Sequence, residues 1–364
     1  MMFDNIYRQK KVFVTGHTGF KGSWLVLWLL KLGAQVIGYS LEPPTQPNHY
    51  DLLSPPIESI VADIRDLSRM CQSIQAFKPA VVFHLAAQSL VRRSYGDPIG
   101  TFETNVIGTV NVLEACRQTD SLQAAVIVTS DKCYENRGQV SGYRETDPMG
   151  GHDPYSASKG CAELVTASYQ KSFFPLEDYQ KSHQTLVASV RAGNILGGGD
   201  WGEDRLVPDI VRAASRNQKV LIRNPQAIRP WQHVMEPLAG YLLLGQQLLG
   251  GKKDFSGAWN FGPEERGHKN VLAIAKELQS YWPAIDFEID SGGRDLHEAD
   301  LLKLDCSKAH TKLGWRPIWN DTKMLKKTVQ WYREFYESGR VLSREQLTAY
   351  TDDAKEQGIS WAMT

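Results

Sequence analysis

The stretch KKVFVTGHTGFKGSWL, Lys10–Leu25, decides how this chain folds. A β-branched run leads into Gly16, Gly19 and Gly22, spaced G-x-x-G-x-x-G, and an apolar helical pattern follows. Glycine lets the backbone approach a pyrophosphate closely, and a helix N-terminus offers unpaired N–H groups with partial positive charge. A strand, a glycine turn and a helix in this order favour a dinucleotide site over a turn that only packs a helix on a sheet.

Short β-branched runs alternate with helical patterns through the first half of the chain, which is typical of βα units on a parallel sheet. Strands are predicted at Lys11–Thr15, Gln35–Tyr39, Glu58–Val61, Ala80–His84, Ala125–Thr129 and Thr185–Val190. Helices are predicted at Ser23–Leu32, Leu67–Phe77, Asn105–Gln118 and Tyr155–Phe173. The segment Glu42–Pro56 holds five prolines and is predicted to be an irregular loop.

The predicted fold class is α/β, a doubly wound parallel-sheet Rossmann domain with a smaller, mixed α/β substrate-binding lobe. From Arg191 onward the alternation fades, and Gly197-Gly198-Gly199 breaks the pattern. We expect residues 1–190 to form the dinucleotide-binding domain, with a returning segment at about 229–260. Residues 191–228 and 261–345 are expected to form the smaller lobe, and 346–364 a C-terminal tail.

Charge and composition argue against several classes of function. Acidic and basic side chains balance at 41 each, which removes the broad positive field that binding to nucleic acid or an anionic membrane needs. The longest apolar run, Trp24–Leu30, is far shorter than the roughly 20 residues of a membrane-spanning helix. Five cysteines without a C-x-x-C pair favour reduced thiols in a cytoplasmic protein, and no metal site is expected. The expected partner is a small molecule.

The choice of cofactor depends on the tips of the second and third strands. No acidic residue ends the second strand to bind a ribose hydroxyl, although Glu42 is a displaced candidate. No arginine follows that strand to accept a 2'-phosphate, so NAD is favoured over NADP. Asp63 and Ile64 follow the third strand, where a carboxylate could accept the adenine amino group. A helix cap or a surface charge is an equally open interpretation of Asp63.

A catalytic group is predicted from two short motifs. VTSDKCY ends the fifth strand with Ser130 at its tip, and DPYSASK places Tyr155 and Lys159 four residues apart on one face of a helix. Together with a positive nicotinamide, Lys159 is expected to lower the pKa of Tyr155 from about 10 toward neutrality, so that the phenolate can act as a base. Ser130 can hydrogen-bond the same substrate hydroxyl.

The glycine turn, Ser130, Tyr155 and Lys159, in this order, resemble the extended short-chain dehydrogenase/reductase superfamily. Asp131-Lys132 and the strings GHTGFKGSW, RAGNILGGGDW and RPWQHV are similar to the CDP-glucose 4,6-dehydratases within it, whereas most sugar dehydratases carry Asp-Glu. The resemblance implies cofactor contacts from Gly16, His17, Thr18, Gly19, Phe20, Gly22, Asp63, Ile64, Leu85, Ala86, Ala87, Thr129, Tyr155 and Lys159. It implies substrate contacts from Gln88, Ser130, Asn194, Arg229 and Arg294.

The resemblance also implies a reaction sequence. Tyr155 takes the proton of the glucose 4-hydroxyl while NAD accepts the C4 hydride, with Ser130 relaying and Lys159 holding the charge. A protonated Asp131 gives its proton to the departing 6-hydroxyl, a base removes the C5 proton, and hydride returns to C6. Lys132 has two open roles. As the C5 base it would need roughly 4 to 5 kcal/mol to be neutral at pH 7, and as an ammonium it would stabilise the enolate.

Other readings of single residues stay open at this stage. The fork of Arg229 or Arg294 suits a pyrophosphate, but either side chain could form a salt bridge between the lobes. Asn105 could order a water or cap its helix. His297 and Trp231 are weaker candidates for substrate contact.

Assembly and competing functions follow from the same resemblance. The helices at Asn105–Gln118 and Tyr155–Phe173 pair in related enzymes, so a homodimer or homotetramer is expected. A 4-epimerase or decarboxylase would not need Asp131-Lys132, and a non-catalytic NAD sensor would be expected to lack Ser130, Tyr155 or Lys159. Cytidine as the nucleotide base, and supply of dideoxy sugars for the lipopolysaccharide O-antigen, rest on the resemblance alone.

Overall fold

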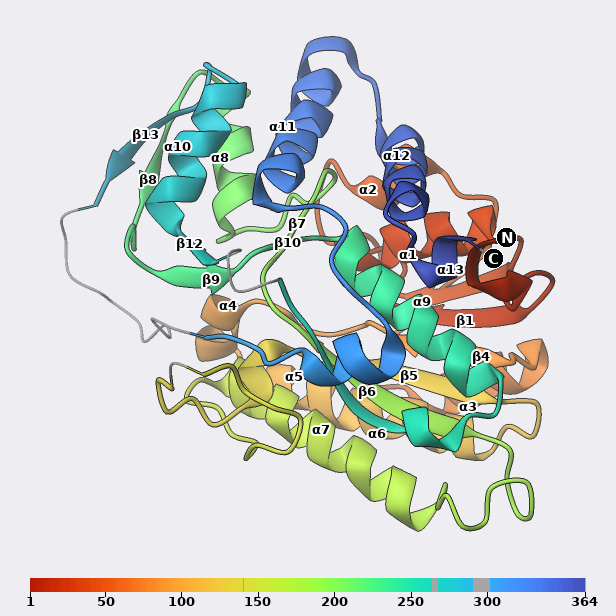
Figure 1. The fold of residues 1–364 in the computed structure, drawn as a ribbon. Coiled ribbons are helices and arrows are strands. Elements are labelled where there is room, and N and C mark those ends of the chain that lie inside the picture. The colour runs from red at the N-terminus through yellow and green to blue at the C-terminus, as the bar shows by residue number, and fades with distance from the viewer. Residues whose placement is uncertain (140, 264–267, 291–301, 364) are drawn as a thin grey trace.

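The computed structural model describes residues 1–139, 141–263, 268–290 and 302–363. A parallel seven-stranded sheet in the order β3-β2-β1-β4-β5-β6-β11 lies at its centre (Figure 1). The strands are β1 Lys11–Thr15, β2 Gln35–Ser40, β3 Glu58–Val61, β4 Val81–His84, β5 Ala124–Val128, β6 Leu186–Ala192 and β11 Gly257–Phe261. The strand order reverses at β1, as in doubly wound folds, which confirms the predicted fold class.

Six of these strands were predicted to within two residues at either end. The seventh, β11, was not predicted as a strand, because its sequence GAWNF lacks the β-branched run that marks the others. The loop prediction for Glu42–Pro56 was wrong in part. A short helix, α2 His49–Leu53, forms there because Asn48 caps it, accepting a hydrogen bond from the Asp51 amide at 2.8 Å.

Helices cover both faces of the sheet (Figure 1). One layer holds α1 Phe20–Lys31, α9 Met235–Leu249, α12 Ser343–Glu356 and α13 Ser360–Met363, and the other holds α3 Leu67–Phe77, α6 Gly108–Arg117 and α7 Pro154–Ser172. Strand residues alternate between the two layers, as the two-residue period of a strand requires. Val12 and Val14 pack with the α1 layer, whereas Phe13 between them packs with α3 and α6.

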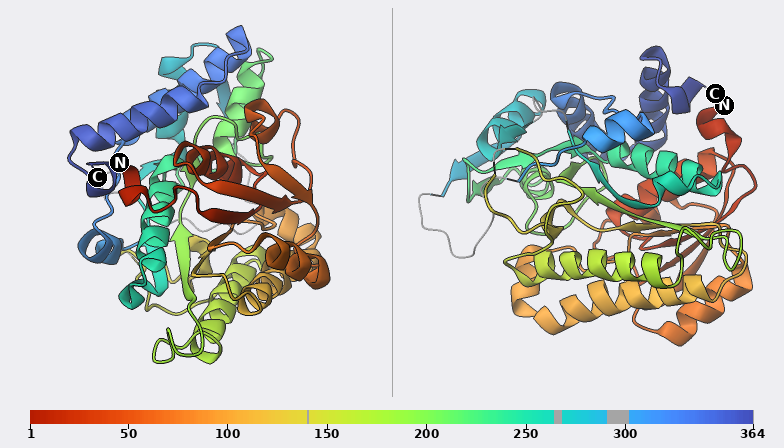
Figure 2. Two further views of the ribbon diagram at one scale, coloured as in Figure 1. Left: turned by 90° about the vertical axis from the view of Figure 1, so that its right-hand side faces the viewer. Right: turned by 60° about the horizontal axis from the view of Figure 1, so that its bottom comes forward.

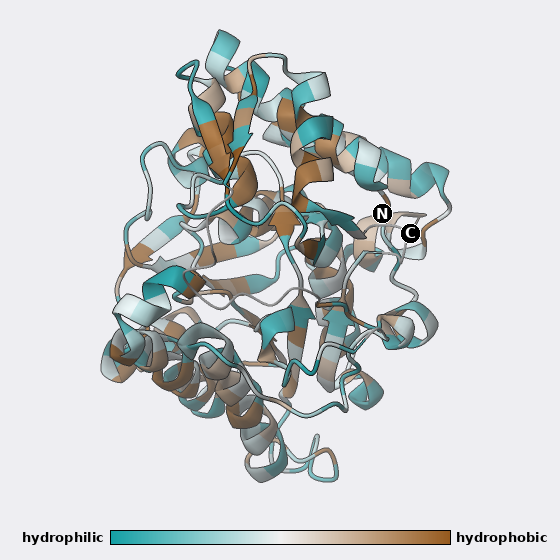
Figure 3. Ribbon diagram, turned by 90° about the vertical axis from the view of Figure 1, so that its left-hand side faces the viewer, coloured by the Kyte–Doolittle hydropathy of each residue, from teal (hydrophilic) through white to brown (hydrophobic). Residues whose placement is uncertain are grey.

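A smaller lobe of mixed α/β structure stands beside the carboxyl ends of the strands (Figure 2). It contains α8 Leu206–Ala214, α10 Val271–Tyr281 and α11 Asp321–Ser338. Its strand pairs are β7 Ile195–Leu196 with β10 Gln232–His233, β8 Lys219–Ile222 with β13 Asp286–Ile289, and β9 Ile228–Pro230 with β12 His268–Asn270. In Figure 3 these elements show brown, hydrophobic segments beside teal ones, as elements with one buried face do.

Between the two parts of the molecule, α9 and β11 return to the sheet after the chain has entered the smaller lobe. The predicted residue limits of the two domains stay predictions. Within the ranges that the structure describes, no helix combines the length and the apolar character that a membrane crossing needs.

The glycine-rich turn at Gly197–Trp201 connects the two parts. Trp24 of α1 donates its indole N–H to the Gly198 carbonyl at 2.9 Å, and the Tyr332 hydroxyl of α11 donates to the Asp200 carbonyl at 2.6 Å. A Cβ atom on Gly198 would lie 2.0 Å from the Trp331 ring. The turn therefore requires glycine because an aromatic ring occupies the space beside it.

We expect Gly198→Ala to lower the free energy of unfolding by about 2 kcal/mol or more, since the buried ring of Trp331 has to move. Gly96→Ala is the matched control, because a Cβ there meets no atom within 4 Å. Urea denaturation of both variants checks this, and equal midpoints would contradict it.

Candidate active site

One large cavity lies at the carboxyl ends of the strands, between the sheet and the smaller lobe. Its volume is about 2350 Å³, well above the roughly 300–1,000 Å³ of a pocket for one small ligand, so it has room for two. The predicted site residues that line it are Gly16, Thr18, Gly19, Phe20, Gly22, Asp63, Ile64, Leu85, Ala86, Ala87, Gln88, Thr129, Ser130, Asp131, Lys132, Tyr155, Lys159, Asn194 and Arg229.

The glycine turn between β1 and α1 packs directly on the end of β4. Gly16 has a φ of +74°, and a Cβ there would lie 2.6 Å from the Ala86 amide nitrogen. A Cβ on Gly22 would lie 2.0 Å from the Gly16 carbonyl oxygen. Gly19 is the N-cap residue of α1 and lines the cavity, and its Cβ would touch only the Gly16 carbonyl, at 3.4 Å. Backbone N–H groups at this helix start can therefore meet a phosphate without a side chain between them.

His17 differs from the other predicted residues of this turn, because it does not line the cavity. Its ring is buried against Gly38, and its Nε2 lies 2.7 Å from the Ser59 hydroxyl. Burial lowers the pKa of His17 to about 4, so the ring is neutral at pH 7. The resemblance implied a cofactor contact for His17, and this contact stays a prediction, while the ring itself packs against Gly38 of β2 and Ser59 of β3.

At the far end of the cavity, Asp63 is held by Arg65, which the sequence analysis did not single out. The Arg65 guanidinium donates to both carboxylate oxygens, with an Nη2–Oδ2 distance of 2.7 Å, and also pairs with Glu103 at 3.2 Å. The Arg65 hydrogen bond lowers the pKa of Asp63. The carboxylate is thus a ready acceptor at the cavity wall, and its contact with adenine stays a prediction.

Ser130, Asp131 and Lys132 form one tight turn, η3 Asp131–Cys133, directly after β5. The Ser130 hydroxyl accepts from the Lys132 amide at 3.2 Å and donates to Asp131 Oδ1 at 3.0 Å. Lys132 Nζ lies 3.7 Å from the same carboxylate oxygen, with 28% of its side chain exposed. Among the described residues, no group hydrogen-bonds the buried Asp131 Oδ2, which leaves this atom available to a bound molecule.

Tyr155 and Lys159 lie on the first turns of α7, next to Ser130. Asp153 caps the helix, and Pro154 is its first residue. The lowered pKa expected for Tyr155 is not found. Burial raises the pKa of Tyr155 to about 12, although its hydrogen bond with Ser130 acts in the opposite direction. Burial also lowers the pKa of Lys159 to about 8. The expectation included the positive charge of a bound nicotinamide and stays a prediction for that state, whereas in the chain alone desolvation outweighs the charge of Arg205.

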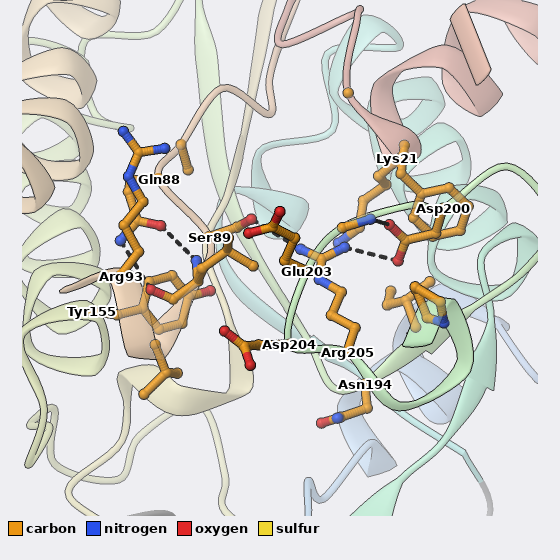
Figure 4. Close-up of a pocket in the computed structure, with 18 of the residues that line it drawn as sticks. Lys21, Gln88, Ser89, Arg93, Tyr155, Asn194, Asp200, Glu203, Asp204 and Arg205 are labelled. Carbon is orange, nitrogen blue, oxygen red and sulfur yellow. Dashed lines mark hydrogen bonds and ion pairs between the residues drawn. The ribbon is translucent and has the colours of Figure 1, made fainter. Parts of the chain in front are cut away.

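Two cations that the sequence analysis missed complete this part of the site (Figure 4). Arg205, from the loop before α8, donates to Asp200 at 2.9 Å and to the Ser89 hydroxyl at 2.9 Å, and its charge acts to lower the pKa of Tyr155. Lys21 projects from the first turn of α1, with Nζ 3.4 Å from the Tyr241 hydroxyl. A lysine within an apolar helix start was the signal available in the sequence.

The pKa of Lys21 is lowered to about 7, first by burial and then by the charges of Lys159 and Arg205, while the charge of Asp131 acts in the opposite direction. Lys21 therefore shares the electrostatic environment of the turn that carries Ser130, Asp131 and Lys132. Its proton is held weakly, mainly because the charged amine is buried.

Gln88 and Asn105 have supporting positions. The Gln88 amide nitrogen donates to the Thr101 hydroxyl at 3.0 Å, so this side chain orders its own loop. Asn105 lies in a π-helical turn, η2 Glu103–Ile107, that precedes α6. Its amide donates to the Gln88 carbonyl at 2.9 Å and to the Ser158 hydroxyl at 2.8 Å. Asn105 therefore ties the loop after β4 to α7, a role that neither of its two predicted interpretations described.

On the opposite wall, Asn194 has a buried side-chain oxygen that lacks a hydrogen-bond partner among the described residues, although it lines the cavity. Arg229 also lines the cavity and donates to the Ile228 carbonyl at 3.1 Å. The Trp231 indole donates to the Lys269 carbonyl at 3.0 Å, within the packing of the smaller lobe. Arg294 and His297 lie outside the described residues.

The site brings the phenol of Tyr155, the hydroxyl of Ser130 and the carboxyl group of Asp131 to one cavity that a glycine turn also lines. Such a set can accept a proton from a hydroxyl group on one carbon of a bound molecule and donate a proton to a group on a carbon nearby. A sequence model described as GDP-mannose 4,6 dehydratase matches residues 13–328 of the chain. The chain belongs to the GDP-mannose 4,6 dehydratase family. The predicted resemblance to nucleotide-sugar dehydratases is confirmed.

Individual members of the wider group are similar over almost the whole of this dehydratase-family chain. A CDP-glucose 4,6-dehydratase of Salmonella typhimurium is 49% identical over 354 residues, covering 96% of this chain and 98% of that protein. An epimerase of Methanothermobacter thermautotrophicus has a similar structure, with a TM-score of 0.79, 23% identity and coverage of 94% and 97%. A dTDP-glucose 4,6-dehydratase of Bacillus anthracis, solved in complex with NAD, has a TM-score of 0.73 and 22% identity, and the match covers 90% of this chain and 98% of that chain. The two structures show the same fold.

We expect the Lys21 ammonium to titrate near pH 7, instead of near its usual value of 10.5, because burial and two neighbouring cations disfavour its charge. Asp131→Asn should move the midpoint lower, since the carboxylate raises this pKa. The ¹³Cε chemical shift of protein labelled with [ε-¹³C]lysine measures it, and Lys21→Arg assigns the signal. Asp204→Asn, also at the cavity wall, is the control and should leave the midpoint in place. A midpoint near 10.5 would contradict the prediction.

Proposed function

We propose that this chain is an NAD-dependent CDP-glucose 4,6-dehydratase, a lyase that converts CDP-glucose to CDP-4-keto-6-deoxyglucose and water. The observation that carries the proposal is the position of Asp131 and Lys132 beside Ser130 at the same cavity as Tyr155. An epimerase or decarboxylase needs no proton donor there. The 49% identical relative, named as a CDP-glucose 4,6-dehydratase, supports the same substrate.

The residues of the glycine turn fit a dinucleotide. Gly16, Gly19 and Gly22 bring backbone close to the cavity where a Cβ at Gly16 or Gly22 would collide, and Asp63 offers an ionised acceptor farther along. We propose that these residues hold NAD, the cofactor present in the B. anthracis structure. When bound, NAD accepts hydride from C4 of the sugar and later supplies it to C6.

In the first half of the reaction, Tyr155 takes the proton of the C4 hydroxyl. Its hydrogen bond with Ser130 links the phenol to the group that orients the same hydroxyl. Burial opposes ionisation of Tyr155, so positive charge near the ring has to favour the phenolate. Lys159 and Arg205 provide it, Lys159 from one helical turn along α7 and Arg205 from across the cavity, where Asp200 and Ser89 fix its guanidinium.

In the second half, the C4 ketone acidifies the C5 proton, a base other than Lys132 removes it as the 6-hydroxyl leaves, and a proton returns to C5 when hydride reaches C6. Asp131 Oδ2 has no hydrogen-bond partner among the described residues, so we assign the transferable proton to this atom. The proton joins the departing hydroxyl and forms water. Lys132 Nζ lies 3.7 Å from Oδ1 of Asp131, at the wall of the cavity. We therefore propose that Lys132 stabilises the enolate.

A direct test supplies CDP-, dTDP-, GDP- and UDP-glucose with NAD in heavy water and follows 4-keto-6-deoxy product by NMR. We expect product from CDP-glucose, and epimerised sugar without loss of water would overturn the proposal.

Asp131→Asn should lower kcat roughly 10²- to 10⁴-fold, because a positioned acid is removed. Asp204→Asn, a control substitution at the same cavity, should leave kcat unchanged. Lys132→Met should retain deuterium exchange at C5, and loss of exchange would make Lys132 the base instead.

For assembly, we propose a homodimer, or a homotetramer built from it, through the layer that contains α7. An apolar surface there joins α5 Pro98–Phe102, η2 and α7. Ile99, Ile107 and Leu164 are 72%, 51% and 60% exposed, which is unusual for three large apolar side chains on neighbouring elements. The two helices predicted to pair between subunits lie in this layer.

We expect Leu164→Asp to shift the protein toward monomer, because it places a charge within the apolar surface. Ile289→Asp is the control, since Ile289 is 50% exposed on β13 in the smaller lobe. Analytical ultracentrifugation measures the change. A wild-type protein that sediments only as a 40.9 kDa species would contradict the proposed assembly.

We place the enzyme in the cytoplasm, as a supplier of 6-deoxy and dideoxy sugars for the lipopolysaccharide O-antigen. The five cysteines are free thiols, which suits a reducing compartment. Cell fractionation, and loss of the sugar from surface polysaccharide after deletion of the gene, test the two parts of this proposal.

A further inference from the structure

A buried ion pair lies behind the catalytic turn, away from the cavity. Glu163 of α7 and Arg191 of β6 are joined by an Nη2–Oε2 contact of 2.7 Å, and each side chain is only 4% exposed. Neither residue is among those that line the cavity. Burying two charges costs more than their attraction usually returns, so such a pair is weak support for stability. Its contacts indicate another role.

The carboxylate holds the residue before the turn. Thr129 lies between the end of β5 and Ser130, and its hydroxyl donates a short hydrogen bond to Glu163 Oε1. The Thr129 amide also donates to the Val190 carbonyl of β6 at 2.9 Å. The hydroxyl of Thr129, predicted to contact the cofactor, is thus directed to Glu163.

The guanidinium holds the residue after the turn. Tyr134 follows Cys133, and its hydroxyl accepts from Arg191 Nη1 at 2.6 Å. The centre of the Tyr134 ring lies 4.9 Å from the guanidinium carbon of Arg191, and the same hydroxyl donates to Asn260 of β11 at 2.7 Å. One rigid pair therefore fixes both ends of the segment that carries Ser130, Asp131 and Lys132.

The same carboxylate acts along α7. Glu163 follows Lys159 by four residues and Tyr155 by eight, so the three side chains share one face of the helix. Burial lowers the pKa of Lys159, and the negative charge of Glu163 opposes that effect. Burial raises the pKa of Glu163 itself, but the charge and hydrogen bond of Arg191 lower it overall, so the carboxylate is ionised.

We propose that the Glu163–Arg191 pair positions the catalytic turn and favours the charged form of Lys159. Both are positioning residues, because they reach the reaction only through Thr129, Tyr134 and Lys159. The inference rests on the proposed function for what the turn does, but the positioning itself is a property of the folded chain.

Three conservative substitutions test the positioning without leaving a buried charge unpaired. Thr129→Val and Tyr134→Phe each remove one hydroxyl that connects the pair to an end of the turn. Ser189→Ala is the matched control. The Ser189 hydroxyl also donates to Glu163, at 2.7 Å to Oε2, but it lies within β6, and in the part of the chain that the structure describes it does not hydrogen-bond to the turn.

Hydrogen exchange, measured by mass spectrometry on a peptide that contains residues 130–134, needs no turnover. The Lys132 and Cys133 amides donate within the turn, so their exchange reports its opening. We expect exchange at least roughly tenfold faster in Thr129→Val and Tyr134→Phe, and within roughly twofold of wild type in Ser189→Ala. Equal exchange in all three variants would overturn the positioning role, whether or not the proposed function holds.

In the dehydratase assay, Thr129→Val and Tyr134→Phe should lower kcat roughly 10- to 100-fold with little change in KM, because misplaced groups act on the transition state. Ser189→Ala should keep the kcat of wild type. Equal losses in the three variants would contradict the proposal. A wild-type protein without dehydratase activity would refute the proposed function only, since exchange decides the positioning separately.

A second measurement concerns charge. In Glu163→Gln, Lys159 loses the anion that raises its pKa, so Lys159 deprotonates at a lower pH. The alkaline limb of the pH profile of kcat should therefore shift to lower pH. A limb that stays in place, or that moves to higher pH, would overturn the electrostatic role of Glu163.

Discussion

The site depends on one steric constraint, the contact of two backbone segments at the glycine turn. At Gly16 the chain passes so close to Ala86 that no Cβ fits between them. This contact joins the ends of β1 and β4, the strands at which the sheet order reverses. Thr15 and His84 reinforce it, with 2.7 Å between the Thr15 hydroxyl and His84 Nδ1. The chain leaves β1 and β4 toward opposite faces of the sheet, and the cavity, a crevice at the carboxyl ends of the strands, opens between them.

Desolvation governs the chemistry that this crevice can support. Burial raises the pKa of Tyr155 and lowers those of Lys21 and Lys159, so each group is moved toward its neutral form. The charges that remain are held by fixed partners, as Arg205 is held by Asp200. When a charged molecule binds in such a site, the protonation of these buried side chains changes. Binding and proton transfer are coupled by the burial itself.

Much of the fold and part of the site could be predicted from the sequence. Strands with β-branched runs, the glycine turn and the Tyr155–Lys159 pair are local patterns, and they were found. Strand β11 was not, because its short sequence has no such run. A motif could name His17 as a cofactor contact, but the direction of its ring, packed against Gly38, depends on the folded turn. Arg205 and the Glu163–Arg191 pair could not be found, since their contacts join segments far apart along the chain.

The covering of α1 has a consequence for how the molecule is made. Trp361 of α13 stacks on Phe3 at 4.9 Å and meets Trp28 of α1 at 5.7 Å, and Figures 1 and 2 show the two ends of the chain side by side. The ribosome synthesises α1 before it synthesises α13, whose Trp361 packs on Trp28 of α1. Until then Trp28 lacks its contact with Trp361. The packing of the helix that follows the glycine turn is thus completed by a segment far along the chain, so this helix reaches its final environment only after α13 has been synthesised.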